Sequence, residues 1–244
     1  MPTETIIILA ISALCIGVSK AGFSGVSLIA VYLLAQTFGA KESLGIALPL
    51  LIMADLMVYP AFRKYGSWAQ VWPLLFPALV GMTLGFILLQ YLPNEVMKPV
   101  IGIIILAMAL IQILRAFYSA QIELLAMSAS FRYSSAASGG IATVLANAAG
   151  PIFQLYFLTI RLPKMELIGV CARFFLVANL TKLPLNAQLN LITKETMMFN
   201  LYLAPVLAIG IFVGKKFLHR IPQKGFEYLI LIFAMIAGIR LTFF

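Results

Sequence analysis

The chain has 244 residues, of which 63% are hydrophobic and 10% are charged, and its formal net charge is +9. It lacks the polar residues needed to cover a water-soluble globule, so the composition excludes a soluble protein and predicts a polytopic membrane protein in a lipid bilayer. Most of the 17 Lys and Arg residues lie in short connections between apolar runs, which indicates cytoplasmic loops and not a nucleic-acid partner.

The first apolar run extends from Thr5 to Phe38 and is too long for one straight crossing. Its 34 residues (38 − 5 + 1) would form a helix about 50 Å long, whereas the hydrocarbon layer is roughly 30 Å thick. The segment from Ser19 to Gly25 places a lysine and two glycines far from either end of the run. We therefore expect the run to break there and the break to form half of a binding site.

Three further spans follow in the first half of the chain, and a more polar connection closes it. The spans are 44–60, 71–91 and 96–114. The connection from Arg115 to Ser135 is the least apolar in the chain. The pattern predicts a first transmembrane repeat over 1–118, a linker over 119–134 and a second transmembrane repeat over 135–244.

The second half repeats this order of features. A run from about 136 to 160 is interrupted at 147–151, and spans at 167–183, 197–217 and 226–244 follow. Asp55-Leu56 with Pro60 corresponds to Asn179-Leu180 with Pro184, at an offset of 124 (179 − 55). A repeat with a broken helix in each half is typical of secondary transporters.

The distribution of basic residues favours one topology for the two broken runs. If each run returns to the side from which it entered, the 15 basic residues outside Lys20 and Arg173 divide ten to five; if each crosses once, they divide eight to seven. The positive-inside rule therefore favours hairpins. We expect an all-α protein of two inverted-topology repeats, each a broken or re-entrant hairpin plus three transmembrane helices. This gives 8 to 10 membrane segments, depending on whether each hairpin is re-entrant or two short spans, and both termini lie outside the cytoplasm.

Inverted repeats bring the two breaks together near the middle of the bilayer. The helices that resume after Gly25 and after Gly150 would each direct free N–H groups and the positive end of a dipole toward that point. Such a pair of ends is an anion site. Gly22 and Ser24 complete the first break, although small residues also serve close helix packing.

The charged side chains in the apolar runs have the sign that an anion site requires. Lys20, Arg173 and Lys182 are cations within or near spans, where exposure to hydrocarbon would cost about 3 kcal/mol or more. Arg173 could instead pair with a helix C-terminus, and Lys182 could reach water. We expect Asp55, the acid deep inside a span, to pair with Lys20 or Lys182 or to carry a proton; a silent ion pair is the alternative.

Two amides add to the candidate site, and catalytic motifs are absent from the sequence. Asn147 and Asn179 can donate to the oxygens of an anion, or else bond the free carbonyls where a helix stops. The sequence contains no HExxH, GxSxG, Walker or CxxC motif, so we expect neither an enzyme nor a metal or cofactor.

Several of these stretches together resemble the TauE/SafE family of membrane anion exporters over about 7–241. They are Ser19-Lys20-x-Gly22, Leu48-Pro49-Leu50-Leu51 with Ala54-Asp55, Leu145 to Pro151, Arg161-Leu162-Pro163-Lys164, and Phe174-Phe175 with Asn179, Lys182 and Pro184. The resemblance implies export or uptake of sulfite, sulfonates or related anions across a bacterial inner membrane. The chain differs from the similar branch at Arg173, where an aromatic residue is more usual, and we expect this cation to favour more highly charged anions.

Together these features predict a transporter of small organic or sulfur-containing anions that works by alternating access, with protons as a candidate coupling ion. An anion channel is the alternative within transport. A membrane assembly subunit or an intramembrane enzyme is the alternative from another class. Substrate identity, direction and oligomeric state are not readable from the sequence.

Overall fold

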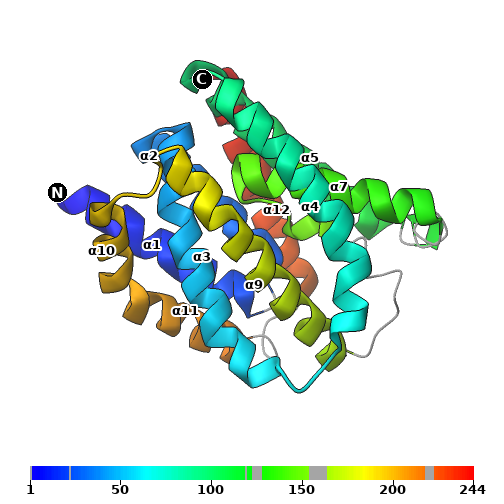
Figure 1. The fold of residues 1–244 in the computed structure, drawn as a ribbon. Helices are drawn as coiled ribbons and strands as arrows, with labels where there is room; N and C mark the ends of the chain where they lie inside the picture. Colours follow the sequence, from blue (N-terminus) through cyan, green and yellow to red (C-terminus); the bar gives the residue numbers. More distant parts are fainter. Residues whose placement is uncertain (1, 22, 119, 123–127, 154–163, 218–222) are drawn as a thin grey trace.

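The computed structural model describes residues 2–21, 23–118, 120–122, 128–153, 164–217 and 223–244, and the regular elements of this part are all helical (Figure 1). They are α1 (Thr3–Lys20), the 3-10 turn η1 (Ser24–Val26), α2 (Ser27–Phe38), α3 (Ala40–Phe62), α4 (Trp68–Tyr91), α5 (Asn94–Phe117), α7 (Ala129–Ala146), α9 (Lys164–Gln188), α10 (Lys194–Tyr202), α11 (Ala204–Phe217) and α12 (Gln223–Phe243).

Membrane-spanning length is reached by several of these helices. Within the described ranges, α1, α3, α4, α5 and α9 are each long and apolar enough to cross a bilayer, and α10 with α11 gives a sixth candidate if the pair counts as one span. α2 and residues 231–243 of α12 are shorter apolar helices. The chain is thus a multi-pass helical membrane protein, while the count of 8 to 10 segments stays a prediction.

Both interruptions expected from the sequence are present. α1 ends at Lys20, and the chain makes the short turn η1 before α2 begins at Ser27. α7 ends at Ala146, where Asn147 takes the left-handed conformation (φ 52°), and helix resumes at Gly150. Asparagine tolerates this conformation better than most residues, so it suits the end of a helix.

Two helices differ from the expected spans. α7 begins at Ala129, before the expected start at 136, and the hydroxyls of Ser134 and Ser138 donate backward to helix carbonyls at 3.1 Å, which satisfies them within the helix. The expected span 197–217 is two helices bent by 48° at Leu203. Pro205 lacks an N–H group and cannot continue the hydrogen-bond ladder of α10.

The helix before each break packs against a helix from the other half of the chain. α1 packs along α11, whereas α7 packs along α4, and these pairs lie on opposite sides of the molecule in Figure 1. Between them α3 packs against α9, and α5 packs against α12. α3 and α9 are antiparallel, because Gly45 near the start of α3 contacts Leu191 after α9, and Gly169 near the start of α9 contacts Tyr65 after α3.

Glycines allow the closest of these contacts. Gly81 and Gly85 of α4 lie against the α7 backbone, and a Cβ on Gly81 would be 1.8 Å from the carbonyl oxygen of Ala137. Gly210 and Gly214 of α11 lie against α1 in the same way. Small residues at four-residue spacing let membrane helices approach until their backbones touch.

We predict that Gly81→Val separates α4 from α7 and lowers the apparent melting temperature by about 5 °C or more, because an overpacked contact costs about 1–3 kcal/mol. Leu84→Val is the matched control, since Leu84 lies on the same helix with 49% of its side chain exposed. Thermal unfolding of both purified variants in detergent measures the difference. Equal melting temperatures would contradict a tight α4–α7 contact.

Candidate functional site

A buried carboxylate joins three helices in the middle of the molecule. Asp55 of α3 accepts a hydrogen bond from the Lys20 ammonium at 2.6 Å on Oδ1, and another from the Asn179 amide of α9 at 2.6 Å on Oδ2. Asp55 and Asn179 are each 2% exposed, whereas the Lys20 side chain is 14% exposed. Of the two partners expected for Asp55, the structure thus places Lys20 in direct contact.

Lys182, one turn beyond Asn179 on α9, lies in a cage of neutral oxygens. Its ammonium donates to the carbonyl and the hydroxyl oxygen of Thr143, each at 3.1 Å, and to Oδ1 of Asn147 at 2.6 Å. The side chain is 2% exposed, so it does not reach water. The cage forms because Thr143 and Asn147 end α7, where carbonyls carry the negative end of the helix dipole.

The two clusters have the same spacing along the chain, but the cation is at the break in the first half and on the long helix in the second half. In the first half a cation at the break, Lys20, bonds an acid on the next long helix 35 residues away; in the second half an amide at the break, Asn147, bonds a cation 35 residues away. Asn179 links the two halves through Asp55. Among the described residues, the joined cluster of Lys20, Asp55 and Lys182 therefore contains two basic side chains and one acidic side chain.

Asn147 also ties the second break to α3. Its Nδ2 donates to the carbonyl of Leu44 at 3.4 Å, and Asn200 of α10 donates to the carbonyl of Ile46 at 3.0 Å. Pro49 lies in the same turns of α3 and lacks the N–H group that would bond the carbonyl of Gly45, four residues earlier.

An aromatic wall lies beside Lys20. The ammonium is 4.6 Å from the centre of the Phe175 ring. Phe175 in turn packs against Phe174 and Phe153, with ring centres 5.2 and 5.7 Å away. Phe153 belongs to the helix that resumes at Gly150, so the second break supplies one side of this wall.

Three residues of the site, Thr143, Phe153 and Phe175, were not predicted from the sequence. The Phe174-Phe175 doublet was a usable signal, since it lies within the stretch that carries the family resemblance. Thr143 gave none, because a threonine in an apolar run most often bonds its own helix.

The small residues of the breaks are placed only in part. Gly25 is buried in η1, and Gly150 is half-buried at the start of the resumed helix. Gly22 lies outside the described residues, and the side chain of Ser24 is not described. Their role as backbone donors to an anion stays a prediction.

Arg173 does not join the other predicted site residues. Its guanidinium donates to the carbonyl of Tyr65 at 2.5 Å, to that of Gly169 at 2.9 Å and to that of Arg63. These contacts cap the C-terminal end of α3, which is the alternative raised for this residue above. Arg173 lies nine residues before Lys182 on α9, a rise of roughly 13 Å, and its contacts lead away from the cluster.

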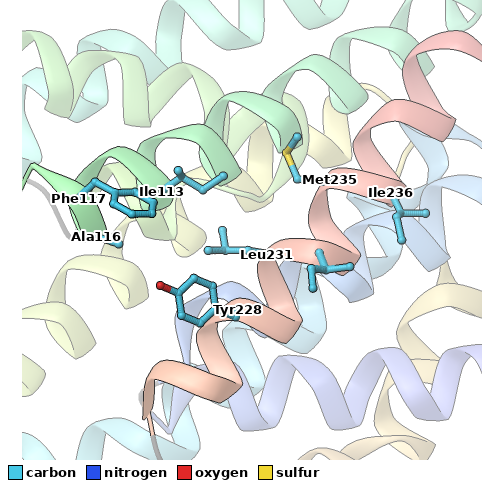
Figure 2. Close-up of a pocket in the computed structure, with 8 residues that line it drawn as sticks. Ile113, Ala116, Phe117, Tyr228, Leu231, Met235 and Ile236 are labelled. Atoms are coloured by element: carbon cyan, nitrogen blue, oxygen red, sulfur yellow. The ribbon is translucent and has the colours of Figure 1, made fainter.

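The pocket in Figure 2 is a separate place. It lies between α5 and α12 and is lined by apolar side chains, among them Ile113, Phe117, Leu231 and Met235, with the Tyr228 ring at one side. None of the side chains that line it is charged, so it does not suit a small anion. In the described part of the chain, no three His, Cys, Asp or Glu residues gather as metal ligands.

Comparison with known proteins gives one match. The family model described as "Sulfite exporter TauE/SafE" matches residues 9–241. No curated protein and no solved structure matches the chain.

We predict that Arg173→Met lowers the apparent melting temperature by about 5 °C or more, because hydrogen bonds to a charged group contribute about 1.5–3 kcal/mol and Arg173 makes three of them. Lys64→Met, which removes an exposed cation at the same end of α3, is the control. Thermal unfolding in detergent separates the two. A melting temperature that falls no further than in the control would show that Arg173 does not secure this end.

Proposed function

Because the chain belongs to the sulfite exporter TauE/SafE family, we propose that it is a secondary transporter of small sulfur-containing or organic anions in a bacterial inner membrane. The observation that carries the proposal is the buried cluster of Lys20, Asp55 and Lys182, with its excess of one positive charge. Removing an uncompensated charge from water costs several kcal/mol. The excess of basic over acidic groups attracts an anion to this cluster.

The polar groups of the cluster suit an oxyanion in particular. The Lys20 and Lys182 ammonium groups and the amides of Asn147 and Asn179 come from α1, α7 and α9, and all four now bond oxygens of the protein. Sulfite, sulfonates and carboxylates each present two or three oxygens to such donors. The Phe153–Phe175 wall beside Lys20 offers an apolar surface for the organic part of a sulfonate.

We further propose two repeats, and matching details of backbone support them. Gly66 and Asn190, 124 positions apart (190 − 66), both have positive φ. Capping boxes follow each of them, at Ser67 with Gln70 and at Thr193 with Thr196. The glycines of the tight contacts correspond as well, with Gly81 and Gly85 matching Gly210 and Gly214 at an offset of 129 (210 − 81, 214 − 85).

The antiparallel packing of corresponding helices supports inverted orientation. α3 and α9 run in opposite directions, and α5 and α12 do as well, since Gly102 near the start of α5 contacts Thr242 near the end of α12. A two-fold axis in the membrane plane relates elements in this way. Lys20 at the first break contacts Asp55 within α3 and not an end of that helix, which supports a break inside the bilayer and a returning hairpin.

This arrangement suits alternating access. The cluster of Lys20, Asp55 and Lys182 lies at the contact between α3 and α9. The helix pairs α1–α11 and α4–α7 lie on either side of this contact (Figure 1). Movement of the α1–α11 pair against α3 and α9 would open the cluster to one face of the membrane. Movement of the α4–α7 pair would open it to the opposite face.

We predict that an anion from the panel of sulfite, methanesulfonate, sulfoacetate and acetate raises the melting temperature of the purified protein by about 5 °C or more at 100-fold excess over its Kd. Lys182→Gln removes the excess charge and should abolish the shift. Lys98→Gln, on α5 away from the cluster, should keep it. A shift that persists in Lys182→Gln would place the anion elsewhere.

Transport itself is measured with the stabilising anion in proteoliposomes. We predict saturable uptake and counterflow, in which unlabelled anion inside the vesicles accelerates entry of labelled anion. Ohmic single-channel currents without counterflow would identify a channel in place of a carrier.

The hairpin predicts that Thr5 and Lys41 lie on the same side of the membrane. Single cysteines at these positions, in a background without Cys15 and Cys171, should react with a membrane-impermeant maleimide from the periplasmic side of intact cells. A cysteine at Lys64, just beyond the opposite end of α3 from Lys41, should react only after permeabilisation. Labelling of positions 5 and 41 from opposite sides would contradict inverted repeats.

A further inference from the structure

We infer that Asp55 is an internal counter-ion, which the substrate anion displaces from Lys20, and that one proton enters the protein with each bound monoanion. This inference rests on the proposed anion transport and specifies the ion that accompanies the substrate. It follows from the contacts of Lys20, Asp55 and Asn179 and from the burial of the carboxylate.

Lys20 is the cation at which an anion can exchange. Lys182 is almost fully buried, and its three N–H hydrogens meet three oxygens of Thr143 and Asn147. Lys20 is more exposed and lies at the end of α1, where the helix has stopped. Its ionic partner, Oδ1 of Asp55, lies at 2.6 Å and occupies the position that an oxygen of a substrate oxyanion would take.

The displaced carboxylate cannot remain ionised at low cost. After losing Lys20, Asp55 keeps the neutral amide of Asn179 at Oδ2 and stays 2% exposed. A buried carboxylate that has lost its cation is strongly destabilising. A proton on Oδ1 removes this charge while Oδ2 continues to accept from Asn179.

The exchange balances in charge and in hydrogen bonds. A proton passes from water to Oδ1 of Asp55, and an N–H···O bond from Lys20 to the substrate replaces the one to the carboxylate. Bound monoanion and bound proton together add no net charge, so the cluster keeps its excess of one positive charge. The new carboxyl O–H can donate to the substrate that has replaced it beside Lys20.

The surroundings of Asp55 make it the group that takes this proton. The charged side chains that act on it are Lys20 from α1 and Lys182 from α9. Of the three groups, Lys182 keeps its three oxygen partners when the anion binds, whereas Oδ1 of Asp55 loses the ammonium that it accepts from. Oδ1 of Asp55 is therefore the atom at which a proton replaces the lost partner.

Calorimetry of purified wild-type protein tests the inference with methanesulfonate, sulfite and sulfoacetate as ligands. Methanesulfonate is most informative, because it is a monoanion at every pH used. Titrations in phosphate and in Tris, which differ in ionisation enthalpy, give the number of protons taken up. We expect about one proton per methanesulfonate and an affinity that falls about tenfold per pH unit above neutrality.

The variant Asp55→Asn has nearly the same shape: its carbonyl oxygen can accept from Lys20, and its NH₂ group can donate to Asn179 once the Asn179 amide turns over to present its oxygen. It should bind methanesulfonate more tightly, without proton uptake and without pH dependence, since no carboxylate competes for Lys20. Glu95→Gln, which neutralises an exposed carboxylate on α5, should behave as the wild type. If Asp55→Asn does not fold, the wild-type proton count decides alone.

The outcomes separate this inference from the proposed function. Binding with no proton uptake in the wild type, or with the same uptake in Asp55→Asn, overturns the exchange and leaves anion transport standing. If none of the three anions binds to the wild type or to Asp55→Asn, both the exchange and the proposed substrate class are wrong. Uptake of one proton by the wild type and by Glu95→Gln, but not by Asp55→Asn, supports the exchange.

Discussion

The contact between Asp55 and its two partners is the constraint on which the rest of the structure depends. A carboxylate at this depth is stable only if both oxygens accept from strong donors, and those donors come from α1 and α9. The requirement fixes the end of α1 at the level of Asp55, in agreement with the proposed returning hairpin. It also sets the register of α9 against α3, because Asn179 must lie opposite Asp55.

The correspondence of Asp55 with Asn179 in sequence has a geometric meaning that the sequence alone did not reveal. Residues at equivalent positions of two repeats contact each other only where they lie on the axis that relates the repeats. Asp55 and Asn179 are equivalent at an offset of 124 and are joined by a 2.6 Å hydrogen bond. The proposed axis therefore passes between them, and the anion cluster lies on it.

The sequence predicted the contacts of some site residues and not of others. The two breaks followed from the length of a membrane span, and a buried acid had to find a cation, so Asp55 was expected to pair with Lys20 or Lys182, between which the structure selects Lys20. Arg173 has a side chain long enough to reach the end of α3, and no pattern along α9 indicates in which direction it points. Thr143 enters the cluster through the folding of α7 onto α9, which requires the three-dimensional arrangement.

Donors from the second half of the chain hold α3 at three levels. The amides of Asn147 and Asn200 bond carbonyls near its start, Asn179 bonds Asp55 in its middle, and Arg173 bonds the carbonyls at its end. The position equivalent to Arg173 in the first half is residue 49 (173 − 124), a proline, so the firm guanidinium clamp exists at one end only. The neutral amide bonds contribute only about 1 kcal/mol each, whereas the charged clamp contributes more. Motion at the cluster is therefore easier at the start of α3, where the Asn147 amide bonds it, than at the end that Arg173 secures.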